Sequence, residues 1–482
     1  MQAHGSAAGP AAVALERCEV LAHRAGESAH GFIVAWATEP SRTLWQVPPR
    51  DDPDRLSEDD GRILSLESAS IAGHTLKLMI LEPGAGALDI EALRAAVAQR
   101  LDSQPRATHR VDTSGPEPRW VPAEAFDIEH HVRRRTDPQC VSKADLWRIV
   151  GGLMSEHLDR SKPLWTFDVI GPLSDGREAI AARIHHAMAD GIAGVHFLDA
   201  VLFDARLDAA PDRAAGSQPG VREAPRLTRL AEARRLPGAV LRELGHPGGH
   251  SPFDRPITIA RELAFVVAPL PQFKAIGAAR PDPATVNDVL LATIAGGLRM
   301  WVGTSAAHQL RAQIPVSLHH RDESTAVAGN RDSFLNIDLP IDEPDPLIRL
   351  DRISAETRRR KRLDDADEMY DLFHALGRIG HIGSAAQRLA GSAREFSLSI
   401  SNVPGPREPV SVSGRRVQNL FSSSEPAAHH ALRITAISCA GDMGIGLCTD
   451  PSALPDIAGL ADAIEASYAE FLSATDPLTS AE

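Results

Sequence analysis

The stretch IHHAMADGIAG (Ile184–Gly194) places two adjacent histidines between an apolar run and a turn of small residues. The run before it, EAIAARI (Glu178–Ile184), is typical of a buried strand. After the turn, apolar residues recur at helical spacing, at Ile192, Val195, Leu198, Val201 and Leu202. The histidines therefore lie at a strand-to-helix junction, from which an imidazole can face a cleft.

A histidine at such a junction suits general-base chemistry, because its ordinary pKa of about 6.5 leaves it mostly neutral at cytosolic pH. Asp190, four residues after His186, can hydrogen-bond the ring or pair with a cation and so hold the loop. Gly191 frees the backbone to turn sharply. Three other doublets sit in surroundings such as DIEHHVRR and SLHHRDES, and we predict that they are solvated surface or loop histidines: His130–His131, His319–His320 and His429–His430.

Two other chemistries fit the same stretch less well. Adjacent histidines on an extended chain point to opposite sides, so His185 and His186 cannot easily share one metal ion. The sequence has no H-E-x-x-H motif and no cysteine pair at metal-ligand spacing. It also has no G-x-S-x-G elbow, since GGHSPF lacks the closing glycine. We therefore expect neither a metal site nor a serine hydrolase.

The composition, with 43% hydrophobic and 24% charged residues, is ordinary for a soluble globular protein. A length of 482 residues exceeds what one hydrophobic core supports, so two lobes are expected. The formal net charge of −13 argues against nucleic-acid binding. Four scattered cysteines predict a reducing, cytoplasmic compartment, and no secretory signal is expected. The most apolar early run, GFIVAW, is too short to span a membrane.

Strand-like and helix-like segments alternate along the chain, which predicts an α/β protein. The expected strands include Thr75–Leu81, Pro163–Ile170, Glu178–Ile184, Leu310–Leu318 and Ser333–Pro340. The expected helices begin near Asp89, Thr285 and Asp345, and a last one covers DIAGLADAIEASYAEFL. Thr285 and Asp288 have the spacing of a capping box.

This pattern divides the chain into five regions. They are an N-terminal extension of unknown role (1–55), a first lobe with the histidine motif (56–205), a linker rich in Pro, Gly and Arg (206–255), a second lobe (256–475) and a tail (476–482). Within the linker, Arg226–Leu244 is basic and amphipathic. It could lie on an anionic membrane or form an ordinary helix pair over the linker.

Several blocks of the sequence together resemble one family. HHAMADG resembles the HHxxxDG motif of the bacterial wax ester synthase/acyl-CoA:diacylglycerol acyltransferases. That family belongs to the CoA-dependent acyltransferase superfamily, with chloramphenicol acetyltransferase and the nonribosomal condensation domains. Further family-like blocks occur in the expected order between about residues 56 and 475: LSEDDGRILSLES, PLWTFDVI, VNDVLLATIAGGLRMW, IPVSL, GNR and SNVPGPREP.

The resemblance implies two chloramphenicol-acetyltransferase-like lobes, each a mixed sheet with flanking helices, which meet at a tunnel around the histidine loop. It also implies that His186 is the base, that His185 shapes the loop, and that Asp190 with Gly191 holds the loop in place. Candidate contacts to substrate or oxyanion are Asn287, Asp288 and Asn402. Two structural roles stay open beside these, since Asn287 could only order its helix start and Asn402 could only fix a rigid loop.

The implied activity is O-acyl transfer from a long-chain acyl-CoA to diacylglycerol, giving triacylglycerol, or to a fatty alcohol, giving wax ester. Such an enzyme serves lipid biosynthesis and glycerol metabolism, and takes acyl-CoA as a substrate without a cofactor. A cytoplasmic protein with peripheral attachment to a membrane or lipid inclusion is then expected. Two alternatives stay open: a condensation-like acyltransferase with another acceptor or a carrier-bound donor, and a non-catalytic protein that binds lipid droplets.

Overall fold

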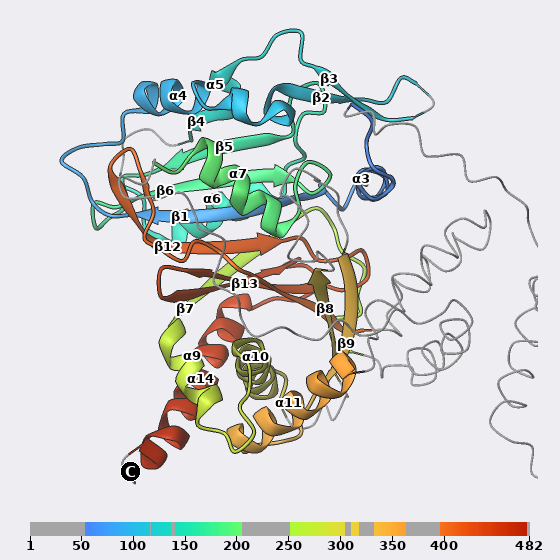
Figure 1. Cartoon of the computed structure of the whole chain (residues 1–482), viewed down its shortest axis with the longest axis vertical. Helices are drawn as coiled ribbons and strands as arrows, with labels where there is room; N and C mark the ends of the chain where they lie inside the picture. The colour runs from blue at the N-terminus through green and yellow to red at the C-terminus, as the bar shows by residue number, and fades with distance from the viewer. Residues whose placement is uncertain are drawn as a thin grey trace, which may run out of the picture. The chain divides into compact units, whose positions relative to one another are not determined.

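The computed structural model describes residues 54–115, 117–135, 140–204, 251–303, 310–317, 332–362 and 396–479, all within one compact unit, Asp54–Glu482. This part of the chain forms two six-stranded sheets with flanking helices, so the predicted two-lobed α/β class is confirmed (Figure 1). The predictions for residues 1–53 and for the segment Arg226–Leu244 lie outside the described residues.

The first sheet contains the predicted hairpin and its histidines. Its strands, in spatial order, are β11 (Ser411–Val412), β12 (Arg415–Ser424), β1 (His74–Leu81), β6 (Glu178–His185), β5 (Trp165–Ile170) and β4 (Val132–Arg134). β5 and β6 pair antiparallel, as the hairpin predicts, and β6 also pairs antiparallel with β1. β11 and β12 come from the second half of the chain, so that half completes the first sheet.

Helices cover both faces of the first sheet because its central strands are apolar on both sides. Buried residues of β1 and β6 such as Met79 and Ile180 pack with α4 (Ile90–Ala98) and α7 (Gly191–Val201) on one face. On the other face, Leu76 and Ala181 share a cluster with α6 (Lys143–Met154). Asp89 caps α4 through the amides of Glu91 and Ala92, as its sequence position predicts.

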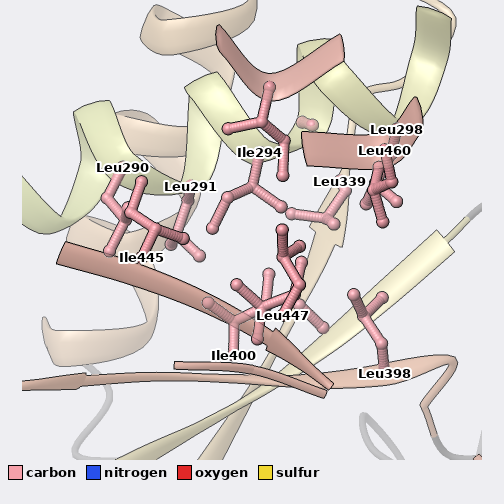
Figure 2. Packing of buried hydrophobic residues seen from close by; sticks show 14 of the residues in the cluster. Leu290, Leu291, Ile294, Leu298, Leu339, Leu398, Ile400, Ile445, Leu447 and Leu460 are labelled. Atoms are coloured by element: carbon pink, nitrogen blue, oxygen red, sulfur yellow. The ribbon is translucent and has the colours of Figure 1, made fainter. Parts of the chain in front are cut away.

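The second sheet has the order β7 (Glu262–Pro269), β14 (Asp442–Thr449), β13 (Leu432–Cys439), β10 (Leu398–Val403), β8 (Leu310–Ser317) and β9 (Asp332–Leu339). One face packs against α9 (Leu270–Ala278), α10 (Val286–Val302), α11 (Pro346–Arg362) and α14 (Ile457–Thr479). Figure 2 shows this core, in which Leu291 and Ile294 of α10 face Ile445 of β14. The opposite face turns toward the first lobe, because Val403, Ile437 and Cys439 belong to the first lobe's core.

Smaller elements complete the first lobe. They are α3 (Glu58–Ser65), α5 (Ile128–His131), two 3₁₀ turns (Leu101–Ser103 and Pro105–Thr108) and the hairpin of β2 (His109–Asp112) with β3 (Arg119–Pro122). A short segment joins α3 to β1, and this segment contacts both histidines of the motif.

The prediction that the other histidine doublets are solvated is wrong for two of their members. His131 is fully buried, stacks on Trp165 at 4.5 Å between ring centroids and binds the Trp165 carbonyl through Nδ1 at 2.7 Å. His430 is 1% exposed and stacks on Phe396. Both act as aromatic core residues. For His131, the neighbouring charged residues of DIEHHVRR conceal this role. His319–His320 lies outside the described residues.

Candidate active site

The backbone of both histidines is held by neighbouring strands. β6 ends at His185, which lies opposite His74 on β1. The amide of His185 donates to the Leu164 carbonyl at 3.0 Å, and the amide of His186 donates to the Gly73 carbonyl at 2.9 Å. The chain then turns through Ala187–Ala189 into α7, which lies across the sheet (Figure 1). The predicted strand-to-helix junction is confirmed.

His185 is fully buried, and both of its ring nitrogens are engaged. Nδ1 accepts the Ala187 amide at 3.0 Å, so the ring proton lies on Nε2. Nε2 then donates to Glu67 Oε1 at 2.6 Å. With both nitrogens occupied, His185 has no site left to take a proton from a substrate.

Glu67 is itself held by a second partner, since Arg160 Nη2 lies 2.5 Å from its Oε2. Burial raises the pKa of Glu67, but the hydrogen bond and charge of His185, with Arg160, outweigh burial and lower the pKa overall. The carboxylate is therefore ionised and is a strong acceptor for the His185 proton. This pair fixes the orientation of the first histidine.

His186 is partly buried and comes directly after His185 in the chain, so its side chain leaves the strand end on the other side of the sheet. Burial lowers its pKa to about 3, and the positive charges of Arg433 and Lys77 add to the effect. The imidazole is consequently neutral throughout the ordinary pH range. A neutral imidazole has one unprotonated ring nitrogen, which is the atom that a general base uses.

Asp190 is the N-cap of α7, where its Oδ1 accepts the Ala193 amide at 2.7 Å. It thereby fixes the point at which the histidine turn becomes a helix. Gly191 is the first helical residue, and a Cβ there would come within 2.9 Å of Val403 Cγ2 on β10. The glycine allows the second sheet to approach the start of α7.

Lys77 on β1 is a charged neighbour of this loop that sequence reasoning missed. Its side chain is 1% exposed, and Nζ donates to Ser422 Oγ on β12 at 2.8 Å. Burial lowers the pKa of Lys77 to about 8, while the Asp190 carboxylate opposes that change. Lys77 thus supplies a cation that acts on Asp190.

Asn287 and Asp288 lie at the start of α10, on the face of the second sheet that turns away from the first lobe. Asp288 forms the predicted capping box with Thr285, and its carboxylate also accepts the Thr357 hydroxyl at 2.7 Å. These contacts join α10 to α11. Asn402 lies on β10 beside Ala436, next to the Val403 that touches Gly191. The contacts described for these residues bring none of them to His186, and their predicted role in binding substrate stays a prediction.

Metal-binding clusters and membrane spans are both absent from the described part of the chain. No group of three or more His, Cys, Asp or Glu side chains in these residues is placed to hold a metal ion. No helix within the same ranges is long and apolar enough to cross a membrane.

Comparison with known proteins assigns the chain to a family. The sequence model described as the wax ester synthase/diacylglycerol acyltransferase catalytic domain matches residues 56–246, and the WS/DGAT C-terminal domain matches residues 328–471. The chain belongs to this family. It is an acyltransferase, and the catalytic-domain match includes the histidine loop, α7 and β1.

Individual relatives agree with the family. A probable diacylglycerol O-acyltransferase of Mycobacterium tuberculosis is 28% identical over 417 residues, which cover 80% of this chain and 88% of the relative. Among solved structures, the wax ester synthase/diacylglycerol acyltransferase from Marinobacter aquaeolei VT8 has a TM-score of 0.65 at 22% identity, covering 87% of this chain and 98% of that one. The first condensation domain of the CDA synthetase has a TM-score of 0.55 at 15% identity, covering 87% and 96%, which places both in one fold.

Proposed function

We propose that this family member transfers a long-chain acyl group from acyl-CoA to the hydroxyl of diacylglycerol, of a fatty alcohol, or of both. The observation that carries the proposal is the division within the histidine pair. His185 uses both of its ring nitrogens to hold the loop, and the low pKa of His186 keeps that ring neutral, as a general base requires. The family and the Mycobacterium relative, named for diacylglycerol, support this choice of substrates.

In the proposed reaction His186 accepts the proton of the acceptor hydroxyl while its oxygen attacks the thioester carbonyl. The resulting tetrahedral oxyanion collapses, the carbon–sulfur bond breaks, and the CoA thiolate takes the proton back from His186. Donor and acceptor meet in one ternary complex, so no acyl-enzyme and no cofactor are needed. The positive charge of Lys77 acts on His186 and opposes charge on the protonated ring, which favours return of the proton to the leaving thiolate.

In the test, the purified protein is incubated with labelled palmitoyl-CoA and one acceptor, either diacylglycerol or hexadecanol. The products are resolved by thin-layer chromatography. Wild type should form triacylglycerol, wax ester or both, and His186→Ala should lose turnover by at least about a hundredfold. His429→Ala, at an exposed member of another doublet, is the matched control and should keep full activity. Ester formation by His186→Ala at the wild-type rate would overturn the assignment of the base.

Both proposed acceptors are water-insoluble, so we also propose that the protein works at a lipid surface. The basic stretch Arg226–Leu244 is the candidate contact by its sequence alone. Replacing its arginines by glutamine should reduce sedimentation with anionic vesicles while leaving turnover of detergent-dispersed acceptor intact. Unchanged sedimentation would remove this contact from the proposal.

A further inference from the structure

The segment between α3 and β1, residues 67–73, touches both histidines. Glu67, the first residue of the segment, binds the ring of His185. The carbonyl of Gly73, its last residue, accepts the His186 amide. Gly73 has a φ of +77° and lies so close to the His185 ring that a Cβ there would meet Nε2. The position of this segment therefore sets the position of the histidine pair.

A buried carboxylate from the second half of the chain holds the same segment. Glu425, directly after β12, is 8% exposed. Its Oε2 accepts the Gly73 amide at 2.6 Å, and its Oε1 accepts the Ala72 amide at 3.1 Å. Burial raises the pKa of Glu425, while the charge of Arg261 and the two amides oppose this. Two adjacent backbone donors on one carboxylate fix the turn into β1 at a defined angle.

Arg261 completes the arrangement from the second sheet. Its side chain is fully buried, and its Nη2 reaches Glu425 Oε1 at 3.2 Å and also donates to the Ser70 carbonyl. Its own amide donates to Ser155 Oγ at 2.9 Å, just after α6. Because Arg261 is the residue before β7, it joins the edge of the second sheet to segment 67–73.

We propose that Glu425 and Arg261 are positioning residues for acyl transfer, which hold segment 67–73 against His185 and His186. The inference rests on the proposed role of His186 as base. The chain of contacts runs from the second sheet through Arg261 and Glu425 to Gly73, and from Gly73 to both histidines. Catalytic geometry then depends on how the two lobes are joined, not on the first lobe alone.

The chain offers a matched control in Glu178. This glutamate is also buried, accepts a backbone amide (Leu88, 2.6 Å), and pairs with an arginine of the second half (Arg415, 2.6 Å). It stands at the opposite end of β6 from His185, seven residues or roughly 23 Å away. Loss of its charge tests the cost of disturbing a buried glutamate without moving the histidines.

The experiment compares Glu425→Gln, Glu178→Gln and wild type by melting temperature, by kcat and KM for palmitoyl-CoA, and by NMR of the His185 ring N–H. Both variants should melt at lower temperature. Glu425→Gln should lower kcat by about 10- to 100-fold with KM within about twofold, since a small displacement of a catalytic group has that effect. It should also shift or broaden the N–H resonance, whereas Glu178→Gln should leave kcat and the resonance unchanged.

Equal loss of kcat in both variants, or full kcat with an unmoved resonance in Glu425→Gln, would overturn the proposal. If Glu425→Gln does not fold, Arg261→Lys is used instead. It keeps the charge but has one nitrogen, whereas Arg261 binds Ser70 and Glu425 through Nη2 and the Thr258 and Ala260 carbonyls through Nη1. The same lower kcat and shifted resonance are expected. The NMR readout separates this proposal from the proposed function. A resonance that moves only in Glu425→Gln shows that Glu425 holds the histidine pair in place, whether or not wild type transfers an acyl group; a lack of transfer would overturn the proposed function alone.

Discussion

Replacing Gly73 by alanine measures how tightly the segment before β1 fits the first histidine. The φ of +77° costs an L-residue about 1–2 kcal/mol. The added Cβ would overlap the His185 ring and lie 2.9 Å from Glu67 Cγ. His185 cannot move aside cheaply, because it is fully buried and its hydrogen bond to a carboxylate is worth about 1.5–3 kcal/mol. Gly73→Ala should therefore lower the free energy of unfolding by about 3–5 kcal/mol and kcat by at least about tenfold.

Gly414→Ala separates backbone strain from the contact with His185. Gly414 has a φ of +73°, but nothing lies within 4 Å of the position its Cβ would take. This variant should lose only about 1–2 kcal/mol and keep its turnover. Urea unfolding monitored by tryptophan fluorescence gives both stabilities, and the palmitoyl-CoA assay gives both rates. Losses of stability that agree within about 0.5 kcal/mol, or full turnover by Gly73→Ala, would refute the fit of this loop to His185.

Three further outcomes are expected. Lys77→Met should stabilise the fold at pH 7 by about 3 kcal/mol, since burial lowers the pKa of Lys77 from 10.5 to about 8. Between these two pH values only the unfolded chain keeps the proton, so the folded wild type becomes more stable as the pH rises. Urea titrations at rising pH should therefore show that the advantage of Lys77→Met vanishes by pH 10.5. The same change removes a positive charge that lowers the pKa of His186, so the pKa of His186 should rise. The acid limb of the kcat/KM profile should then move to higher pH, whereas kcat/KM of wild type should not change between about pH 5 and 7. An unmoved acid limb would contradict the coupling of Lys77 to His186. Asp190→Ala and Asp89→Ala should each lose about 1 kcal/mol as lost helix caps, but only Asp190→Ala should reduce kcat, and equal rates would deny its loop a catalytic role.

Local sequence signals predict most of the elements correctly. The hairpin of β5 with β6, the cap at Asp89 and the capping box at Thr285 are all confirmed. These features depend on residues within a few positions of one another, so spacing and residue type suffice. The placement of β12 could not be found in this way. No strand is predicted from the sequence at Arg415–Ser424, and nothing in the local sequence indicates that this segment pairs with β1, more than 300 residues earlier.

The residues of the candidate site likewise fall into those that the sequence predicts and those that only the fold brings together. The histidines, Asp190 and Gly191 are adjacent in sequence and form one junction in the structure. Glu67, Lys77 and Glu425 were missed as site residues, because each meets the junction through tertiary contacts. Glu67 lies within the family-like block LSEDDGRILSLES, but nothing in that block indicates a contact with His185. For Lys77, the available signal was a charged residue inside an apolar strand. Lys77 interrupts TLKLMIL, and a lysine on a strand that is otherwise buried marks a place where a partner is needed.

The junction of the two lobes explains why these distant residues converge. β12 hydrogen-bonds to β1 in the first sheet and also lies against β14 of the second. Gly444 and Gly446 on β14 make this approach possible, because a Cβ at either position would meet the carbonyl of Leu420 or Ser422 on β12. In this arrangement Ser422 on β12 binds Lys77, and Glu425, directly after β12, binds the residue before β1. Residues of the second half hold both Lys77 and segment 67–73 in place. The first lobe by itself therefore contains His186, the proposed base, but not the residues that fix its position.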